Sequence, residues 1–407
     1  MILLLVASSA SPLLTKQPHI VFIMADDLGW GDVGWTTPHM KDVTSTLTKL
    51  AQKGLILSQH YVQQVCSPSR AALMTGMYPY HIGRQKGAIK PLQPTGLTLE
   101  RSLLPEQLRK LGYTNHIVGK WHLGFCKWEY TPTWRGFDSF YGFYTGAETH
   151  FEHERANHFD FRRNTKVDFT SKGFYSTDLF TNEAVSIIGN HNMSKPLFLF
   201  LSFQAVHAPL EAPASELSKI KRTGNAARDI YRAMLSRLDR GVRKVVKALK
   251  NGGGWENTLF VFITDNGGAV KKAGSNYPLR GTKSTLFEGG TRGVGFVTGG
   301  FLLRSGEIIS SLMHITDWYP TLLSAAGHRL IEETETDGVD QWDVLRYENT
   351  SKRTEIVYNL KMIPSSMGAI RMGPYKLMFR KNFKKDGWHD IDGKPNGKNM
   401  STLLNNK

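Results

Sequence analysis

The chain has 407 residues, of which 40% are hydrophobic and 21% are charged, so it is long enough to bury one large core plus a small appendage, and it is not a minimal module. It carries 51 Lys and Arg against 35 Asp and Glu, a formal net charge of +16 that predicts acidic partners. Because the sequence has no zinc-finger spacing, basic arm or RNP-like aromatic motif, nucleic acid is a weaker candidate than anionic lipid or sulfated polysaccharide.

The first residues, MILLLVASSASPLL, predict a signal peptide over residues 1–17. Export to the secretory pathway follows, with the lysosome or the extracellular space as destinations. Three glycosylation sequons, at Asn192, Asn349 and Asn399, agree with export. No later stretch is long and apolar enough to predict a transmembrane segment, and the chain has only two cysteines, so the core is expected to hold without a disulfide framework.

Short apolar runs that alternate with amphipathic stretches predict an α/β domain with a mostly parallel sheet. Three runs, at 19–27, 196–209 and 258–268, have the composition of buried strands. Helical spacing of apolar residues is found at 101–112, 177–190 and 317–327, and also at 227–254, where three glycines end the pattern.

A composition shift near residues 334–353 indicates a linker between two parts of unequal size. We expect a large domain over 18–345 and a small C-terminal subdomain over 346–407. Within the second part, 355–360 and 369–380 have the pattern of strands in a small antiparallel sheet, and the polar stretch 384–407 is expected to be poorly ordered.

Acidic and amide side chains follow two of the predicted strands. Asp26 and Asp27 end the first, and Asp265 and Asn266 end the third. Each pair alone is typical of a solvated turn. However, open α/β sheets form their sites beyond the strand C-termini, where clustered carboxylates would repel by about 4 kcal/mol per close pair. Oxygen ligands of this kind suit calcium or magnesium, so the pattern predicts a metal site.

Basic and titratable side chains occur near other strand ends. Lys120 and His122 lie in GKWHLG, on one face if that stretch is extended, and His207 lies in AVHAP. Lys283 lies in a glycine-rich loop at 278–293. Each is unremarkable by itself, as a surface pair, a loop histidine or a mobile lysine. Beside a divalent cation, the four together suit an anionic tetrahedral substrate.

A cysteine lies at the start of a predicted helix in VCSPSRAALMTG, residues 65–76. Ser67 and Pro68 indicate the helix start, which places Cys66 and Arg70 near a helix N-terminus that favours anions. A tyrosine phosphatase loop would need five residues between Cys and Arg, and here only three intervene. A papain-like protease has a different cysteine context. Because calcium prefers oxygen to sulfur, the working atom at position 66 is expected to be an oxygen.

The segment C-S-P-S-R-A-A-L-M-T-G resembles the signature C-x-P-S-R-x-x-L-x-T-G of the type I sulfatases throughout. Further resemblance runs through ADDLGWGDVGW, GYTNHIVGKWHLG, RGFDSFYGF, FITDNGG and PLRGTKSTLFEGGTRGVGF to AIRMGPYKL, and is greatest to the animal arylsulfatase B group and arylsulfatases I and J. The resemblance implies an alkaline phosphatase-like α/β fold, in which a large mostly parallel sheet is flanked by helices and a small C-terminal antiparallel sheet follows. It also implies that the cysteine is oxidised to Cα-formylglycine by the formylglycine-generating enzyme.

The resemblance also implies roles for the residues above. One Ca²⁺ per chain would be bound by Asp26, Asp27, Asp265, Asn266 and the modified residue 66. Arg70 and Lys120 would hold the aldehyde hydrate, His122 would act as a base, and His207 and Lys283 would bind the sulfate. In the implied mechanism one hydroxyl of the hydrate attacks sulfur, and the other then expels sulfate as the aldehyde re-forms.

The implied function is calcium-dependent hydrolysis of sulfate esters, including aryl sulfates and glycosaminoglycans of the N-acetylgalactosamine 4-sulfate type. The sequence departs from the family in having only Cys126 as a second cysteine and in its shorter C-terminal part. Two alternatives remain open at this stage. One is a phosphatase or phosphodiesterase of the alkaline phosphatase-like group, and the other is an inactive glycan-binding relative.

Overall fold

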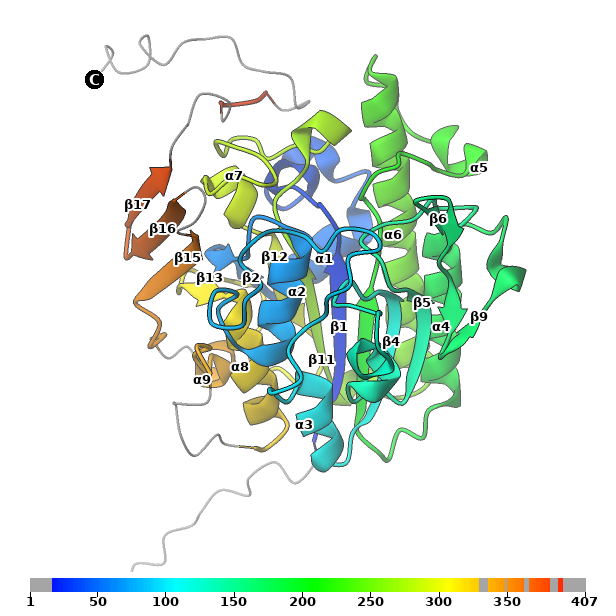
Figure 1. Cartoon of the computed structure of the whole chain (residues 1–407), viewed down its shortest axis with the longest axis horizontal. Helices are drawn as coiled ribbons and strands as arrows, with labels where there is room; N and C mark the ends of the chain where they lie inside the picture. The colour runs from blue at the N-terminus through cyan, green and yellow to red at the C-terminus, as the bar shows by residue number, and fades with distance from the viewer. Residues whose placement is uncertain (1–16, 329–335, 348–349, 362–365, 381–386, 391–407) are drawn as a thin grey trace, which may run out of the picture.

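A computed structural model of the chain describes residues 17–328, 336–347, 350–361, 366–380 and 387–390. Its centre is a 10-stranded mixed sheet (Figure 1). In spatial order the strands are β13 (Glu307–Ile309), β2 (Leu55–Leu57), β12 (Gly295–Thr298), β11 (Thr258–Thr264), β1 (His19–Ala25), β10 (Leu197–Ser202), β4 (Thr114–Lys120), β5 (Ser139–Phe143), β8 (Arg162–Arg163) and β9 (Lys166–Val167). Strands β11, β1, β10, β4 and β5 run parallel, so their carboxyl ends lie at one edge.

Both faces of the sheet are covered, which is why its central strands are apolar throughout rather than alternating. Along β1, Ile20, Phe22 and Met24 belong to one core cluster, and Val21 and Ile23 belong to the other. The first cluster is completed by α2 (Cys66–Thr75), α3 (Leu104–Lys110), α8 (Trp318–Ala325) and α9 (Trp342–Tyr347). The second is completed by α1 (Ser45–Lys53), α4 (Ser176–Asn190) and α6 (Ala226–Asn251). The helices therefore form two layers around the sheet.

A small antiparallel sheet follows at the C-terminal end, with β15 (Glu355–Lys361), β16 (Met367–Met372) and β17 (Tyr375–Arg380). It lies beside the large sheet, at the left of Figure 1. Its inner side packs through Tyr358 against Tyr61, with ring centroids 5.9 Å apart. Arg353, just before β15, forms a buried ion pair with Asp317 at the start of α8, so the small sheet is fixed to the large part.

Shorter elements connect these layers. The strands are β3 (His60–Tyr61), which pairs with β14 (Met313–His314), and β6 (Glu154–Arg155), which pairs with β7 (His158–Phe159). The short helices are α5 (Ala214–Leu217), α7 (Glu288–Thr291) and the 3-10 turns Trp30–Asp32, Pro38–Met40, Trp128–Tyr130, Pro132–Trp134, Phe169–Ser171, Trp255–Asn257, Val270–Lys272 and Ile315–Asp317.

The predicted α/β architecture is confirmed, and each predicted strand or helix contains an element of the expected type, with ends that differ from the sequence pattern. Part of the linker predicted within 334–353 is helical, because α9 buries Trp342, Val344 and Leu345 in the core. Residues 1–16 of the signal peptide predicted over 1–17 lie outside the described part, as do the sequons at Asn349 and Asn399. Asn192 lies exposed after α4.

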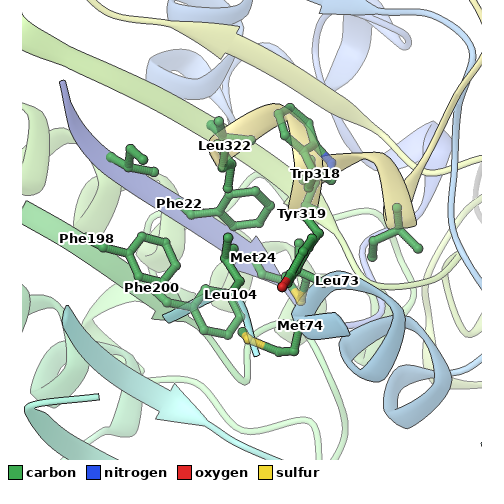
Figure 2. Close-up of a cluster of buried hydrophobic side chains, with 14 of the residues drawn as sticks. Phe22, Met24, Leu73, Met74, Leu104, Phe198, Phe200, Trp318, Tyr319 and Leu322 are labelled. Atoms are coloured by element: carbon green, nitrogen blue, oxygen red, sulfur yellow. The ribbon is translucent and has the colours of Figure 1, made fainter. Parts of the chain in front are cut away.

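The strand that leads to the candidate site depends on an aromatic cluster (Figure 2). Phe22 of β1 is 1% exposed, and its ring centroid lies 5.4 Å from that of Trp318 and 5.9 Å from that of Phe200. We predict that Phe22→Ala lowers the free energy of unfolding by about 3–5 kcal/mol, because it leaves a cavity that this packed cluster cannot fill. Denaturant titration measures the change.

Phe169→Ala is the matched control, because Phe169 is 69% exposed. Its loss should change stability by no more than about 0.5 kcal/mol. A Phe22→Ala protein as stable as this control would contradict the packing described for β1.

Candidate active site

The predicted acidic residues meet because β1 and β11 are parallel neighbours with Ala25 opposite Thr264. Asp26 and Asp265 are the next residues on each strand, and both are fully buried. The backbone NH of Asp27 donates to Asp265 Oδ1 at 3.3 Å. The amide of Asn266 donates to Asp27 Oδ1 at 2.7 Å. The two strand ends therefore form one acidic centre.

The guanidinium of Arg70 crosses this centre from α2 and is itself 1% exposed. Its Nε and Nη2 both donate to Asp265 Oδ2, at 3.1 and 2.9 Å. Its Nη1 donates to the hydroxyl of Ser202 at 2.6 Å and to the Lys120 carbonyl at 3.1 Å. Asp26 Oδ2 lies 3.8 Å from Nη2. Arg70 thereby contacts four strand ends, those of β11, β10, β4 and β1.

Two lysines complete the charge balance of the centre. The ammonium of Lys120, the last residue of β4, contacts Asp26 Oδ2 in a fully buried ion pair. Lys283 lies in the loop before α7, and its Nζ is 2.6 Å from Asp27 Oδ1. With Arg70 these residues place three cations against three carboxylates.

Two histidines face the same centre. His207 Nε2 lies 3.7 Å from Asp27 Oδ2, and its Nδ1 contacts the Ala208 carbonyl at 2.6 Å. His122 Nε2 contacts the Ile89 carbonyl at 2.9 Å, while its buried Nδ1 has no hydrogen-bond partner in the described part of the chain. Burial, and then the charge of Lys120, lowers the pKa of His122 well below its usual value, so the ring is neutral.

Lys120 and His122 would share one face only if the stretch were extended, and this condition is not met. Strand β4 ends at Lys120, and His122 has a φ of 61°, in the left-handed region. The backbone NH groups of Trp121 and His122 donate to the carbonyls of Phe143 and Tyr144, which holds this turn. As a result the two side chains do not share a strand face, although both reach the centre.

Cys66 is the first residue of α2, so Ser67 is not the N-cap that the sequence predicts. Val65 occupies that position, and the Ser67 hydroxyl accepts from the backbone NH of Ile89 at 3.0 Å instead. Burial raises the pKa of the Cys66 thiol, although Lys120 and Lys283 act against it. The unmodified thiol is therefore protonated at neutral pH and a poor nucleophile.

The acidic centre contains buried oxygen atoms that are available to bind a cation. Asp26 Oδ1 and Asn266 Oδ1 are buried without a hydrogen-bond partner among the described residues. Burial and repulsion by Asp26 raise the pKa of Asp265, so the charge of this carboxylate is not fully compensated. Ligand atoms of Asp26, Asp27 and His207 lie within 4.8 Å of one another. A hard divalent cation with oxygen ligands fits this donor set.

Sequence reasoning missed a group of polar residues behind His207. Gln204 exchanges hydrogen bonds with the backbone of Glu148, at 2.6 and 3.4 Å, and contacts His150 Nε2 at 3.1 Å. His150 Nε2 also contacts the His207 carbonyl at 3.1 Å. The signal that the sequence offered for this group is Gln204, a polar residue two positions after the apolar strand β10. Ser202, the Arg70 partner, ends that strand.

A sequence profile of the family described as Sulfatase matches residues 18–328. The chain belongs to the sulfatase family. It is 39% identical to mouse arylsulfatase J over 391 residues, which cover 94% of this chain and 65% of that protein. Mouse N-acetylgalactosamine-6-sulfatase is 31% identical over 89% of this chain and 72% of its own length. The chain thus spans about two thirds of the length of mouse arylsulfatase J.

Solved structures share the fold of this chain. The crystal structure of Ps i-CgsB in complex with k-i-k-neocarrahexaose has a TM-score of 0.82 and 31% identity, covering 90% of this chain and 84% of that one. The expected alkaline phosphatase-like fold is confirmed. Among the described residues, no helix meets the length and apolarity that crossing a membrane requires.

Proposed function

We propose that the chain hydrolyses sulfate esters by means of a Cα-formylglycine made from Cys66. One observation supports this most strongly: every residue that the family resemblance assigns to the site converges on one buried centre at the strand C-termini. Among them, Arg70 and Asp265 are 195 positions apart and bonded directly. A buried, protonated thiol has no evident use in that setting, whereas an oxygen nucleophile does.

The hydrated aldehyde at residue 66 would supply the attacking oxygen that the thiol lacks. Arg70 and Lys120 place fixed positive charge beside this position, with no reorganisation needed during reaction. His122 is suited to be the base, because its Nε2 is engaged with a carbonyl and its neutral Nδ1 is open to accept a proton. Lys283 and His207 would bind the sulfate and protonate the leaving oxygen.

We propose Ca²⁺ as the cation, one per chain, bound by oxygens of Asp26, Asp27, Asp265, Asn266 and residue 66. It would add two positive charges to a centre whose side chains sum to zero, which favours an anionic substrate. Calcium at about 100 times its Kd should stabilise the folded chain by about 2.7 kcal/mol, visible as a rise in Tm on titration after chelation. Asp27→Ala should remove the rise, and Asp138→Ala, at an exposed pair, should keep it.

The proposed substrates are sulfated glycosaminoglycans with N-acetylgalactosamine 4-sulfate, and small aryl sulfates in vitro. The net charge of +16 suits a polyanion. Resemblance to the arylsulfatase B group favours the 4-sulfate, and the 6-sulfatases among the relatives make the 6-sulfate its direct competitor. We further propose maturation by the formylglycine-generating enzyme in the secretory pathway, ending in the lysosome or outside the cell.

Release of sulfate from a small aryl sulfate tests the function. Protein co-expressed with the formylglycine-generating enzyme should turn over in calcium buffer, and the same protein made without that enzyme should be far less active. Disaccharides sulfated at position 4 or 6 then test specificity, with the larger kcat/KM expected for position 4. Absence of turnover with every sulfate ester would overturn the proposal.

Gly146, which packs against the His122 ring, allows the role of His122 to be tested directly. A Cβ added at Gly146 would lie 2.6 Å from both Cε1 and Nε2 of the His122 ring, closer than real contacts allow. Gly146→Ala should therefore displace the ring and lower kcat for aryl sulfate about 10- to 100-fold, since a 1 Å misplacement can cost that much. Gly189→Ala is the control, because its Cβ would meet nothing within 4 Å. Equal kcat for the two variants would contradict a role for His122.

A further inference from the structure

The described C-terminal segment 387–390 returns to the loop that precedes α7. The backbone NH of Gly281 donates to the Gly387 carbonyl at 3.2 Å. The guanidinium carbon of Arg280 lies 4.8 Å from the Trp388 ring centroid and 4.0 Å from that of Phe287. In Figure 1 the segment is the short red element next to α7. An aromatic side chain is thus fixed at a definite place, far from the strands that precede it.

That place borders the candidate active site. The same loop carries Lys283, whose backbone NH donates to the Gly268 carbonyl at 3.1 Å and whose Nζ contacts Asp27. Arg280 is three residues earlier, so the two backbones are separated by at most about 10 Å. Trp388 contacts this loop at Arg280, three residues from the lysine. A group bound at Lys283 would therefore extend toward Trp388 only if it were longer than one sugar ring.

Resting on the proposed function, we propose that Trp388 is a stacking platform for a sugar ring next to the one that carries the sulfate ester. The ring is only partly buried, so some of its surface is open to a ligand. A tryptophan offers a large, rigid, apolar surface at low cost in conformational entropy, and it matches the C–H faces of a pyranose. The cation of Arg280 against the ring holds its orientation.

A purely structural role for Trp388 makes a different prediction. If the ring only fixed the loop, its loss would displace Lys283, and ligands of every length would bind less well. A platform affects only ligands that reach it. Comparison of a short and a long sulfated saccharide therefore separates the two roles.

Calorimetric binding to a Cys66→Ala background avoids turnover during the measurement. The probes are N-acetylgalactosamine 4-sulfate and a chondroitin 4-sulfate tetrasaccharide. We expect Trp388→Ala to weaken tetrasaccharide binding about tenfold, as loss of an aromatic anchor typically does, and to leave the monosaccharide within about twofold. Trp388→Tyr should recover most of the loss. Trp134→Ala, which removes a 59% exposed ring from the turn before β5, is the control and should change neither.

Equal weakening for both probes would overturn the platform in favour of the structural role, and unchanged tetrasaccharide affinity would overturn it too. The platform would also be overturned if the Cys66→Ala parent did not bind the tetrasaccharide. Failure of the proposed function is recognised separately. In that case the mature protein hydrolyses no sulfate ester, whereas the selective effect of Trp388→Ala on tetrasaccharide binding would still support the platform.

Discussion

Replacing Cys66 by alanine is expected to lower sulfate ester turnover by about 10⁴-fold or more, as loss of a nucleophile does in other covalent hydrolases. The reason is chemical, because alanine cannot be converted to an aldehyde and supplies no oxygen. The fold should be retained, since the side chain is small and alanine is favourable in a helix. Initial rates with an aryl sulfate, together with a thermal unfolding curve, measure both effects.

Cys126→Ala is the matched control, because Cys126 is the only other cysteine and is exposed. Its turnover and Tm should equal those of the parent. If the Cys66→Ala protein kept a substantial fraction of the parent rate, the nucleophile would have to be another residue.

Arg70→Ala is expected to give the largest loss of stability of any substitution in the site, about 3–5 kcal/mol in calcium-free buffer. The change leaves the buried carboxylates of Asp265 and Asp26 without their shared guanidinium, and it leaves the Ser202 hydroxyl without its donor. The buffer has to contain a chelator, because a bound cation would compensate part of the negative charge that the substitution leaves unpaired. Denaturant unfolding followed by circular dichroism gives the free energy.

Arg109→Ala supplies the comparison for this prediction. Arg109 pairs with Asp138 at 2.8 Å, but the side chains are 49% and 39% exposed. Such surface pairs contribute about 0–1 kcal/mol, so the control should be nearly as stable as the parent. A loss below about 1 kcal/mol for Arg70→Ala would show that Arg70 does not compensate the buried carboxylates.

The convergence of the site could be predicted from the sequence because it depends on local signals that repeat. Asp26 and Asp265 each end an apolar strand, and parallel strands bring such ends to one edge. The signature around Cys66 then indicated the family, which the match over residues 18–328 confirms. Lys120, His207 and Lys283 were found by the same rule, as charged or titratable residues near strand ends or in a glycine-rich loop.

Contacts that depend on tertiary packing could not be predicted in this way. The left-handed turn at His122 depends on Phe143 and Tyr144 of the neighbouring chain segment. Val65 rather than Ser67 is the N-cap of α2, and the serine hydroxyl accepts from the backbone NH of Ile89 instead. The return of Trp388 to Arg280 likewise joins segments more than a hundred residues apart, and neither segment shows it by pattern.

Peptide mass spectrometry across residue 66 of active protein tests the central claim most directly. The account predicts a peptide whose mass shows an aldehyde in place of the Cys66 thiol, in a proportion that follows the specific activity of each preparation. Fully active protein in which every copy of that peptide carries an intact thiol would contradict it.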